Sequence, residues 1–208
     1  MIRLAVCVSG GGTSLQNLLD LIAAGKLDAE VVQVVASRPN IGAIARAEKA
    51  GVPVAVAASS KAVPAAEYTA AVFDPIRANR ADLVLFAGFL ALVDIPADYE
   101  GRVMNIHPAL IPSFCGKGYY GRRVHQAAID YGVKVSGCTV HFADDTYDTG
   151  PIILQRSVPV LETDDADALA ARVFEAERQA LPEAVALFAA GRLKIEGRRV
   201  RILPADEA

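Results

Sequence analysis

The sequence has few cysteines and no closely spaced pair of them. Its 208 residues include only Cys7, Cys115 and Cys138, and none are spaced as Cys-x-x-Cys. This odd, scattered set predicts neither a disulfide framework nor a zinc knuckle. Cys7 and Cys138 lie in apolar runs and are expected in the core. Cys115 lies in a loop, where a cysteine–histidine nucleophile with His107 is an alternative, although nothing around it resembles a nucleophile setting.

The sequence also lacks long apolar runs and an excess of positive charge. No apolar run reaches the roughly 18 residues that a membrane-spanning helix needs, and the first residues do not follow the pattern of a signal peptide. A net charge of −3 gives no sign of a nucleic-acid-binding surface. We therefore expect a cytoplasmic protein that acts on small molecules, as a monomer or homodimer, without nucleic-acid or membrane partners.

The distribution of apolar residues predicts the fold. Hydrophobic residues make up 53% of the sequence and charged residues 22%, without repeats or linkers, so we expect a single domain over residues 1–208. Strand-like and helix-like stretches alternate, which predicts an α/β fold with a doubly wound, mostly parallel central sheet and helices on both faces. Two final strand-like runs predict a C-terminal hairpin. The strand-like stretches are 2–9, 30–37, 53–57, 82–87, 102–106, 133–142, 151–158, 193–196 and 199–203, and the helix-like stretches are 15–22, 41–50, 65–79, 122–131 and 165 to about 190.

A glycine-rich stretch follows the first strand-like run. The residues Ser9-Gly-Gly-Gly-Thr-Ser14 separate this run from a helix. A strand, a glycine loop and a helix together place backbone amides and a positive helix terminus around a phosphate. Leu15 stands where a dinucleotide fingerprint has a third glycine, and the Gly-Lys-Ser/Thr of a P-loop is absent. A phosphate monoester therefore fits better than NAD or ATP, and the alternative is a tight turn that serves packing alone.

Two polar side chains end the fifth strand-like run. Asn105 and His107 are two residues apart, so on an extended segment their side chains point the same way. Pro108 and Pro112 prevent the strand from continuing, and ligands bind at the carboxyl ends of strands in open parallel sheets. An amide donor and a titratable imidazole would then converge on one pocket. The alternative is a structural pair that satisfies loop carbonyls.

Two further segments leave several interpretations open. An acidic, turn-rich loop holds Asp144, Asp145 and Asp148, which allow a metal site, a solvated turn or one functional acid. The oxygen spacing is poor for a metal, so we expect none. The segment 88–93 is too apolar for an ordinary exposed loop. It is either part of the core or the wall of a pocket for a flat apolar ligand.

Five separated motifs, taken in order and with their spacing, point to one family. The motifs are Ser9–Gln16, Ala87–Phe89, Asn105–Pro112, Thr139–Phe142 and Asp148–Ile153. They resemble the folate-dependent formyltransferases, and within them the phosphoribosylglycinamide (glycinamide ribonucleotide) formyltransferases. The likeness covers nearly the whole chain. The Asn-x-His-Pro and Asp-x-Gly-Pro motifs are common to all folate-dependent members, whereas the glycine loop and the length resemble this particular one.

The resemblance implies a Rossmann-like formyltransferase fold and a reaction. The family transfers the formyl group of 10-formyltetrahydrofolate, a co-substrate, to the amino group of 5′-phosphoribosylglycinamide in de novo purine biosynthesis, without a metal. By this match Asn105, His107 and Asp148 are catalytic. Asn105 would donate a hydrogen bond to the oxyanion of a tetrahedral intermediate, and His107 would stabilise it as imidazolium and relay the proton. Asp148, if adjacent, would raise the pKa of His107.

The resemblance also implies binding residues. The substrate-binding residues are Gly12, Thr13, Ser14, Pro108 and Glu177, and the folate-binding residues are Leu90, Ala91, Leu92, Val93, Asp144 and Asn105. His141 matches the family's second histidine and is expected to support the site. The chain has Phe174 where a polar or basic residue often helps to hold the phosphate, and Ala65 where some members have a basic residue facing the folate tail. The candidates for the missing charge are Lys117, Arg122 and Arg123.

Three other functions remain possible at this point. One is hydrolysis of formyltetrahydrofolate, another is formyl transfer to a different amine, and the third is a non-catalytic phosphate- or folate-binding module. The hydrolases usually carry an N-terminal regulatory domain, and the methionyl-tRNA enzymes add a C-terminal domain and a basic surface. We expect none of these additions from this sequence, and assay of the purified protein separates the remaining functions.

Overall fold

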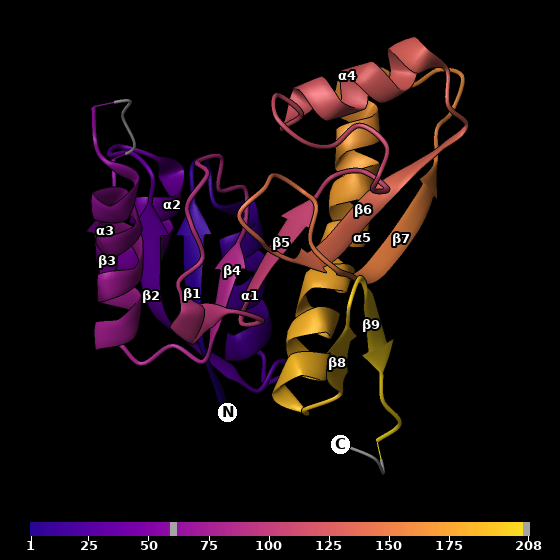
Figure 1. The fold of residues 1–208 in the computed structure, drawn as a ribbon. Helices are drawn as coiled ribbons and strands as arrows, with labels where there is room; N and C mark the ends of the chain where they lie inside the picture. Colours follow the sequence, from indigo (N-terminus) through magenta and orange to yellow (C-terminus); the bar gives the residue numbers. More distant parts are fainter. Residues whose placement is uncertain (59–61, 206–208) are drawn as a thin grey trace. The chain divides into compact units, whose positions relative to one another are not determined.

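The computed structural model describes residues 1–58 and 62–205 (Figure 1). By its internal contacts the chain divides into two compact units, one from Met1 to Met104 and the other from Asn105 onward. Each unit contains a sheet with helices, and each is described by itself. The prediction of a single domain over residues 1–208 stays a prediction.

The first unit is built on a parallel sheet in which the strand order is β3-β2-β1-β4. Its strands are β1 (Ile2–Val8), β2 (Ala29–Ala36), β3 (Val54–Val56) and β4 (Leu83–Phe86), and its helices are α1 (Thr13–Ala23), α2 (Gly42–Lys49), α3 (Ala65–Ala78) and the short 3₁₀ helix η1 (Ala97–Tyr99). The neighbouring strands pair in parallel throughout. Every residue of β4 is buried. Because a strand buried on both faces has no polar side, its sequence is a continuous apolar run.

The carboxyl ends of β1 and β4 lie side by side, because Cys7 pairs with Phe86. The glycine loop follows β1, and the apolar segment 88–93 follows β4. The amide of Ser9 donates to the Gly88 carbonyl (3.0 Å), and the amide of Leu90 donates to the Ser9 hydroxyl oxygen (2.9 Å). The Ser37 hydroxyl is 2.6 Å from the same oxygen. The predicted phosphate loop and part of the predicted folate pocket are therefore direct neighbours.

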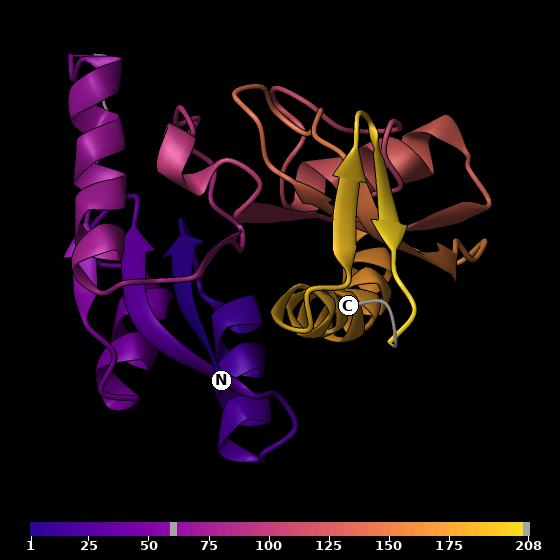
Figure 2. The ribbon, with the colours of Figure 1, turned by 60° about the horizontal axis from the view of Figure 1, so that its bottom comes forward.

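The second unit has the strand order β5-β6-β7-β9-β8. Its elements are β5 (Val103–His107, which begins at the end of the first unit), α4 (Arg122–Tyr131), β6 (Val135–Phe142), β7 (Ile152–Pro159), α5 (Ala166–Ala189), β8 (Leu193–Glu196) and β9 (Arg199–Ile202). Strands β6 and β7 are antiparallel, and β8 and β9 form an antiparallel hairpin, which is drawn in yellow in Figure 2. Helix α5 packs against β6 and β7.

The predicted strands and helices are confirmed, with small shifts at their ends. Each predicted stretch overlaps an observed element, including the C-terminal hairpin. Helix α1 begins at Thr13, two residues before the predicted start. Helix α5 is capped by Asp165, whose carboxylate accepts from the amides of Asp167 and Ala168, and it continues through Pro182. None of the helices within residues 1–58 and 62–205 combines the length and the apolar character needed to cross a membrane.

Candidate active site

The structure brings Asn105, His107 and Asp148 together in the second unit. Asn105 and His107 lie on β5, and Asp148 reaches them from the loop between β6 and β7. The Asn105 Nδ2 amide donates to Asp148 Oδ1 (3.2 Å), and His107 Nδ1 is 3.5 Å from Asp148 Oδ2. The positional argument from the sequence predicts this neighbourhood. The catalytic roles of the three residues stay predictions.

The imidazole of His107 is buried between two acceptors. Its Nε2 lies 2.9 Å from the Phe114 carbonyl oxygen, and because a carbonyl only accepts, Nε2 carries a proton. Only 4% of the side chain is exposed. Burial lowers the pKa of His107 below its ordinary value, while the charge of Asp148 and the Phe114 carbonyl act in the opposite direction. The effect expected of Asp148 is present, but burial outweighs it.

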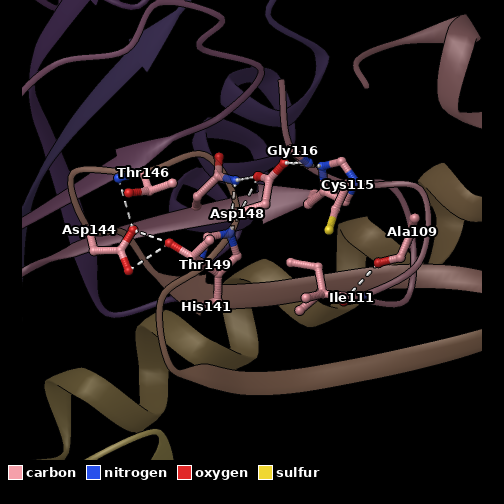
Figure 3. Close-up of polar contacts among 12 residues, drawn as sticks. Ala109, Ile111, Cys115, Gly116, His141, Asp144, Thr146, Asp148 and Thr149 are labelled. Atoms are coloured by element: carbon pink, nitrogen blue, oxygen red, sulfur yellow. Dashed lines mark hydrogen bonds and ion pairs between the residues drawn. The ribbon is translucent and has the colours of Figure 1, made fainter. Parts of the chain in front are cut away.

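The carboxylate of Asp148 is held by a main-chain donor. The Gly116 amide donates to Asp148 Oδ2 (2.8 Å), as Figure 3 shows. Burial on its own would raise the pKa of Asp148, but contacts with His141, His107 and this amide outweigh burial and bring it below its usual value. Asp148 is therefore an anion at neutral pH. Its backbone has φ 58°, a left-handed conformation that Asp and Asn tolerate better than most residues.

The loop residues Phe114 and Gly116 were missed by the sequence analysis as contributors to this site. Both act through the main chain: one carbonyl holds His107, and one amide holds Asp148. Their φ angles are 49° and 89°, so the backbone here turns in a way that an extended loop would not. The glycines of this stretch indicated an unusual backbone, but no sequence signal specified which main-chain groups it presents.

Cys115 lies between these two residues but is not activated as a nucleophile. Its Sγ donates to the Pro112 carbonyl (3.3 Å). Burial raises the pKa of the Cys115 thiol, and the negative charge of Asp148 raises it further. A reactive cysteine needs surroundings that stabilise the thiolate. The surroundings of Cys115 argue against the cysteine–histidine alternative.

The three glycines of the first unit's loop differ in what the fold requires of them. Gly12 has φ 75°, and a Cβ there would lie 2.7 Å from the Ala43 Cβ, so packing alone requires glycine. A Cβ at Gly10 or Gly11 would meet nothing within 4 Å, and neither residue has a positive φ. Neither packing nor backbone conformation therefore requires glycine at positions 10 and 11. Close approach of a ligand to the backbone is a reason for glycine at both positions.

The glycine loop presents unpaired backbone donors beside positive charge. Helix α1 makes its first hydrogen bond from Gln16 to Gly12, and the amides of residues 10–15 bond to no group in the described chain. Arg46 Nε donates to the Gly11 carbonyl (2.9 Å), and Arg38 Nε donates to the Ser9 carbonyl (3.0 Å). Neither guanidinium forms an ion pair within residues 1–58 and 62–205. Unpaired amides at a helix N-terminus favour anions.

The charged residues proposed from the sequence to replace the missing contact lie in the second unit. Arg122 pairs with Asp167 (2.9 Å), and the Arg123 guanidinium lies 5.0 Å from the centre of the Tyr120 ring. Lys117 lies in the loop before α4. Arg38 and Arg46 are additional candidates, which the sequence analysis did not consider.

Glu177 and Pro108 are also in the second unit. Pro108 directly follows β5, and Glu177 lies on α5. Both are half-buried. Burial raises the pKa of Glu177 to about 7, and no hydrogen bond or ion pair from a described residue compensates it. A half-buried carboxyl without a partner is suited to receive hydrogen-bond donors from a ligand.

The residues predicted to bind folate fall into two groups. Leu90 and Leu92 are 44% and 45% exposed, Ala91 is half-buried, and Val93 is buried. The Asp144 carboxylate closes its own turn by accepting from the Thr146 amide (3.1 Å) and the Thr149 hydroxyl (2.7 Å), as Figure 3 shows. These contacts use part of the hydrogen-bonding capacity of Asp144 within its own turn, and its role in folate binding stays a prediction.

In the part of the chain that the structure describes, no group of three or more His, Cys, Asp or Glu residues is arranged to hold a metal ion. The acidic loop instead uses Asp144 to close its turn and Asp148 to contact the two histidines.

Comparison with known proteins identifies the family. The formyl transferase family model matches residues 2–185. A chloroplastic phosphoribosylglycinamide formyltransferase of Vigna unguiculata is 41% identical over 185 residues, covering 88% of this chain and 59% of its own length. The trifunctional purine biosynthetic protein adenosine-3 of Drosophila melanogaster is 39% identical over 91% of this chain and 14% of its own length. The chain thus spans 59% of the length of the first relative and 14% of the length of the second.

A solved structure gives the same result for the fold. Glycinamide ribonucleotide transformylase 1 from Symbiobacterium toebii has a TM-score of 0.91 and 42% identity, covering 98% of this chain and 95% of that one. This similarity confirms the predicted α/β class with a mostly parallel sheet and flanking helices. Together with the family match over residues 2–185, it shows that the chain belongs to the formyl transferase family.

Proposed function

We propose that this protein transfers the formyl group of 10-formyltetrahydrofolate to the amino group of 5′-phosphoribosylglycinamide, in de novo purine biosynthesis. The observation that carries the proposal is the partly buried cluster of Asn105, His107 and Asp148, in which an amide and an imidazole each lie within hydrogen-bonding or ion-pairing range of one anion. The choice of substrates rests on the names of relatives at 41% and 42% identity.

The chemistry needs no covalent intermediate. The amine lone pair bonds to the formyl carbon, and the carbonyl π pair moves to the oxygen. The nitrogen of the amine loses one proton, and N10 of the folate gains one. When the carbonyl re-forms, the bond between the formyl carbon and N10 breaks, and the products are a formamide and tetrahydrofolate. No atom is oxidised or reduced, so the protein must supply positioning, charge stabilisation and a proton path.

His107 and Asp148 suit the charge and proton steps. Because Nε2 of His107 donates to Phe114, Nδ1 is the ring nitrogen whose protonation can change. In the neutral ring, the Nδ1 lone pair faces the Asp148 carboxylate at 3.5 Å, whereas protonation makes this an attractive ion pair. Charge that develops on the substrate oxygen therefore favours the imidazolium. Loss of one such stabilising contact typically raises a barrier by roughly 3 kcal/mol.

The first unit suits the phosphate of the amine substrate. The unpaired amides of residues 10–15, with Thr13 and Ser14 in the first turn of α1, form an anion site. Arg38 and Arg46 add positive charge beside the loop. In this proposal, Arg38 and Arg46 supply the positive charge that a basic residue at the position of Phe174 supplies in other members of the family. Glu177 would accept from donors elsewhere on the same substrate, where its unpartnered carboxyl gains hydrogen bonds.

For the folate, the exposed side chains of Leu90 and Leu92 offer apolar surface next to the glycine loop. Flat aromatic groups bind favourably to such surface when polar main-chain groups fix their orientation. The loop around Asp144 supplies the main-chain groups in the second unit. The folate is a co-substrate here, and the proposal requires no metal.

The test is an assay of the purified protein with 10-formyltetrahydrofolate, with and without phosphoribosylglycinamide, followed by folate absorbance. Turnover that requires the amine supports the proposal. Turnover without it indicates a formyltetrahydrofolate hydrolase, and no turnover in either sample indicates a binding module. Glycinamide or an amino sugar nucleotide in place of the ribonucleotide tests transfer to another amine.

We also propose that the protein is cytoplasmic, that it is a monomer or a homodimer, and that it binds no nucleic acid. Cell fractionation with an antibody to the protein tests the location. Light scattering of the purified protein, with and without ligands, tests the oligomeric state.

A further inference from the structure

One hydroxyl group on β6 fastens the chain segment that follows β5. The side chain of Thr139 is fully buried, with 0% exposed. Its hydroxyl donates to the Ala109 carbonyl (2.7 Å) and accepts from the Ile111 amide (3.1 Å). It also accepts from Gln155 Nε2 (3.0 Å). A hydroxyl has one proton and two lone pairs, so these three contacts use all of its hydrogen-bonding capacity.

Gln155 completes the fastening from the neighbouring strand. It lies directly opposite Thr139 in the antiparallel pair of β6 and β7. Besides its bond to the Thr139 hydroxyl, Gln155 Nε2 donates to the Ile111 carbonyl (3.0 Å). A carbonyl only accepts, so the atom that faces Ile111 must be the amide nitrogen. Ile111, which is labelled in Figure 3, is thus held at both its amide and its carbonyl.

The sheet lacks a side chain at the point where the segment touches it. A Cβ at Gly137 would lie 2.8 Å from Leu110 Cδ2, and closer still to the Arg156 carbonyl oxygen. Gly137 is two residues before Thr139 on β6, so both positions face the same side of the sheet. We call Gly137, Thr139 and Gln155 the loop seat. It holds residues 109–111 by close packing and by hydrogen bonds.

The loop that leaves this seat carries two main-chain groups of the candidate active site. Three residues after Ile111, the Phe114 carbonyl accepts from His107 Nε2 (2.9 Å). Two residues later, the Gly116 amide donates to the Asp148 carboxylate (2.8 Å). Main-chain groups have no side-chain rotamers of their own, so the path of the chain alone places them. The anchor at Ile111 therefore limits where both groups lie.

We infer that Gln155 is a positioning residue for the proposed formyl transfer, because it fixes segment 109–111 and thereby the Phe114 carbonyl that orients the ring of His107. The inference rests on the proposed function and leaves the expected catalytic roles unchanged. Gln155 is exposed, so it adds little to the core, and its two hydrogen bonds are its main contribution to the structure. It acts on the active site only through the loop.

The kinetic consequence follows from the geometry. Without a fixed Phe114 carbonyl, the Nε2 proton of His107 loses its acceptor, and the ring is less often in the orientation that the proton step needs. A displacement of about 1 Å can cost a reaction a hundredfold in rate. The substrates are bound mainly by other groups in the proposed function. Loss of the anchor should therefore lower kcat and leave the KM values nearly unchanged.

Gln155→Met removes both donors and keeps the length of the side chain. We expect kcat to fall about ten- to a hundredfold, with KM for each substrate within about twofold of the wild type. The midpoint of urea unfolding should stay close to that of the wild type, since the residue is exposed. Ser157→Ala, at the next exposed position on the same face of β7, is the matched control and should keep the wild-type kcat. A wild-type kcat in Gln155→Met would overturn the inference.

NMR of His107 separates positioning from a purely structural role and does not depend on turnover. In the wild type, the Nε2 proton held by Phe114 should exchange slowly with water and give a ring ¹⁵N–¹H signal. In Gln155→Met this proton should exchange at least several times faster, while the amides of β4 keep their protection. Unchanged exchange of the Nε2 proton would overturn the inference, even if kcat falls.

The hydroxyl of Thr139 provides a second, independent pair of variants. Thr139→Ser keeps the hydroxyl, whereas Thr139→Val keeps the shape and removes it. Thr139→Ser should retain most of the wild-type kcat and the slow exchange at His107, and Thr139→Val should show both changes expected of Gln155→Met. Equal behaviour of the two variants would contradict the role of the seat. If the wild-type protein transfers no formyl group, the proposed function fails, and the exchange measurement still decides whether the seat positions His107.

Discussion

Gly150 and Phe142 are in such close contact that only glycine fits at position 150. A Cβ there would lie 1.8 Å from the Phe142 carbonyl oxygen. The same oxygen accepts from His141 Nδ1, and the Phe142 amide donates to the Pro151 carbonyl (2.9 Å). The end of the acidic loop is thus fixed against the end of β6, two residues after Asp148. The Asp-x-Gly-Pro motif therefore has a packing reason for its glycine.

Gly150→Ala should reduce both stability and activity. The side chain forces apart two main-chain segments that hydrogen-bond to one another, which we expect to cost about 2–4 kcal/mol of the free energy of unfolding. Urea unfolding measures this cost. Gly10→Ala is the control, because a Cβ there meets nothing within 4 Å. Equal stability of the two variants would contradict the crowding argument.

Asp148→Asn should lower the pKa of His107 further and reduce kcat. The amide keeps the shape and tolerates φ 58°, but it removes the charge that opposes the effect of burial on His107. We expect kcat to fall about 100-fold or more, with KM for both substrates nearly unchanged, because the charge acts mainly in the transition state. NMR titration of His107 alongside the kinetics checks this. An unchanged histidine pKa with near-normal kcat would mean that Asp148 only shapes its turn.

Gly11→Ala should weaken binding of the phosphorylated substrate without unfolding the protein. The added methyl group meets nothing in the chain, but it occupies space next to the unpaired amides. The KM for phosphoribosylglycinamide should rise about tenfold or more, the equivalent of at least one charge-assisted hydrogen bond, while the folate KM stays constant. Gly12→Ala cannot serve here, since it also clashes with Ala43. A normal ribonucleotide KM in a stable Gly11→Ala protein would show that the loop is purely structural.

Glu177→Gln should alter how stability depends on pH. Burial raises the pKa of Glu177 from its ordinary value of 4.5 to about 7 in the folded protein. Stability from the protonated form is thus fully present below pH 4.5 and is lost as the pH rises to about 7. The wild type should lose up to about 3 kcal/mol across this window relative to the variant. Unfolding of both proteins at pH 4.5 and pH 8 measures it, and an identical difference at the two pH values would refute the shift.

The sequence predicts side-chain neighbours better than main-chain ones. Apolar runs placed the strands, and strand order then brought Asp148 to His107 across 41 positions. The contacts of Phe114 and Gly116 could not be predicted, because any residue has a carbonyl and all but proline have an amide. Which main-chain groups of this loop point toward His107 and Asp148 depends on its three-dimensional path, which the sequence does not specify.

The hydroxyl of Ser9 has a consequence for how the two substrates affect one another. It is buried, and it bonds with the Leu90 amide and the Ser37 hydroxyl, while the Ser9 carbonyl accepts from Arg38. If the proposed folate site includes the Leu90 segment, a shift of that segment on folate binding also shifts the start of the glycine loop, where we propose that the phosphate binds. The resulting coupling of affinities is reciprocal: whatever factor the folate applies to phosphate binding, the phosphate applies to folate binding. Calorimetric titration of each ligand in the presence of the other measures that factor, and Ser9→Ala should bring it close to one.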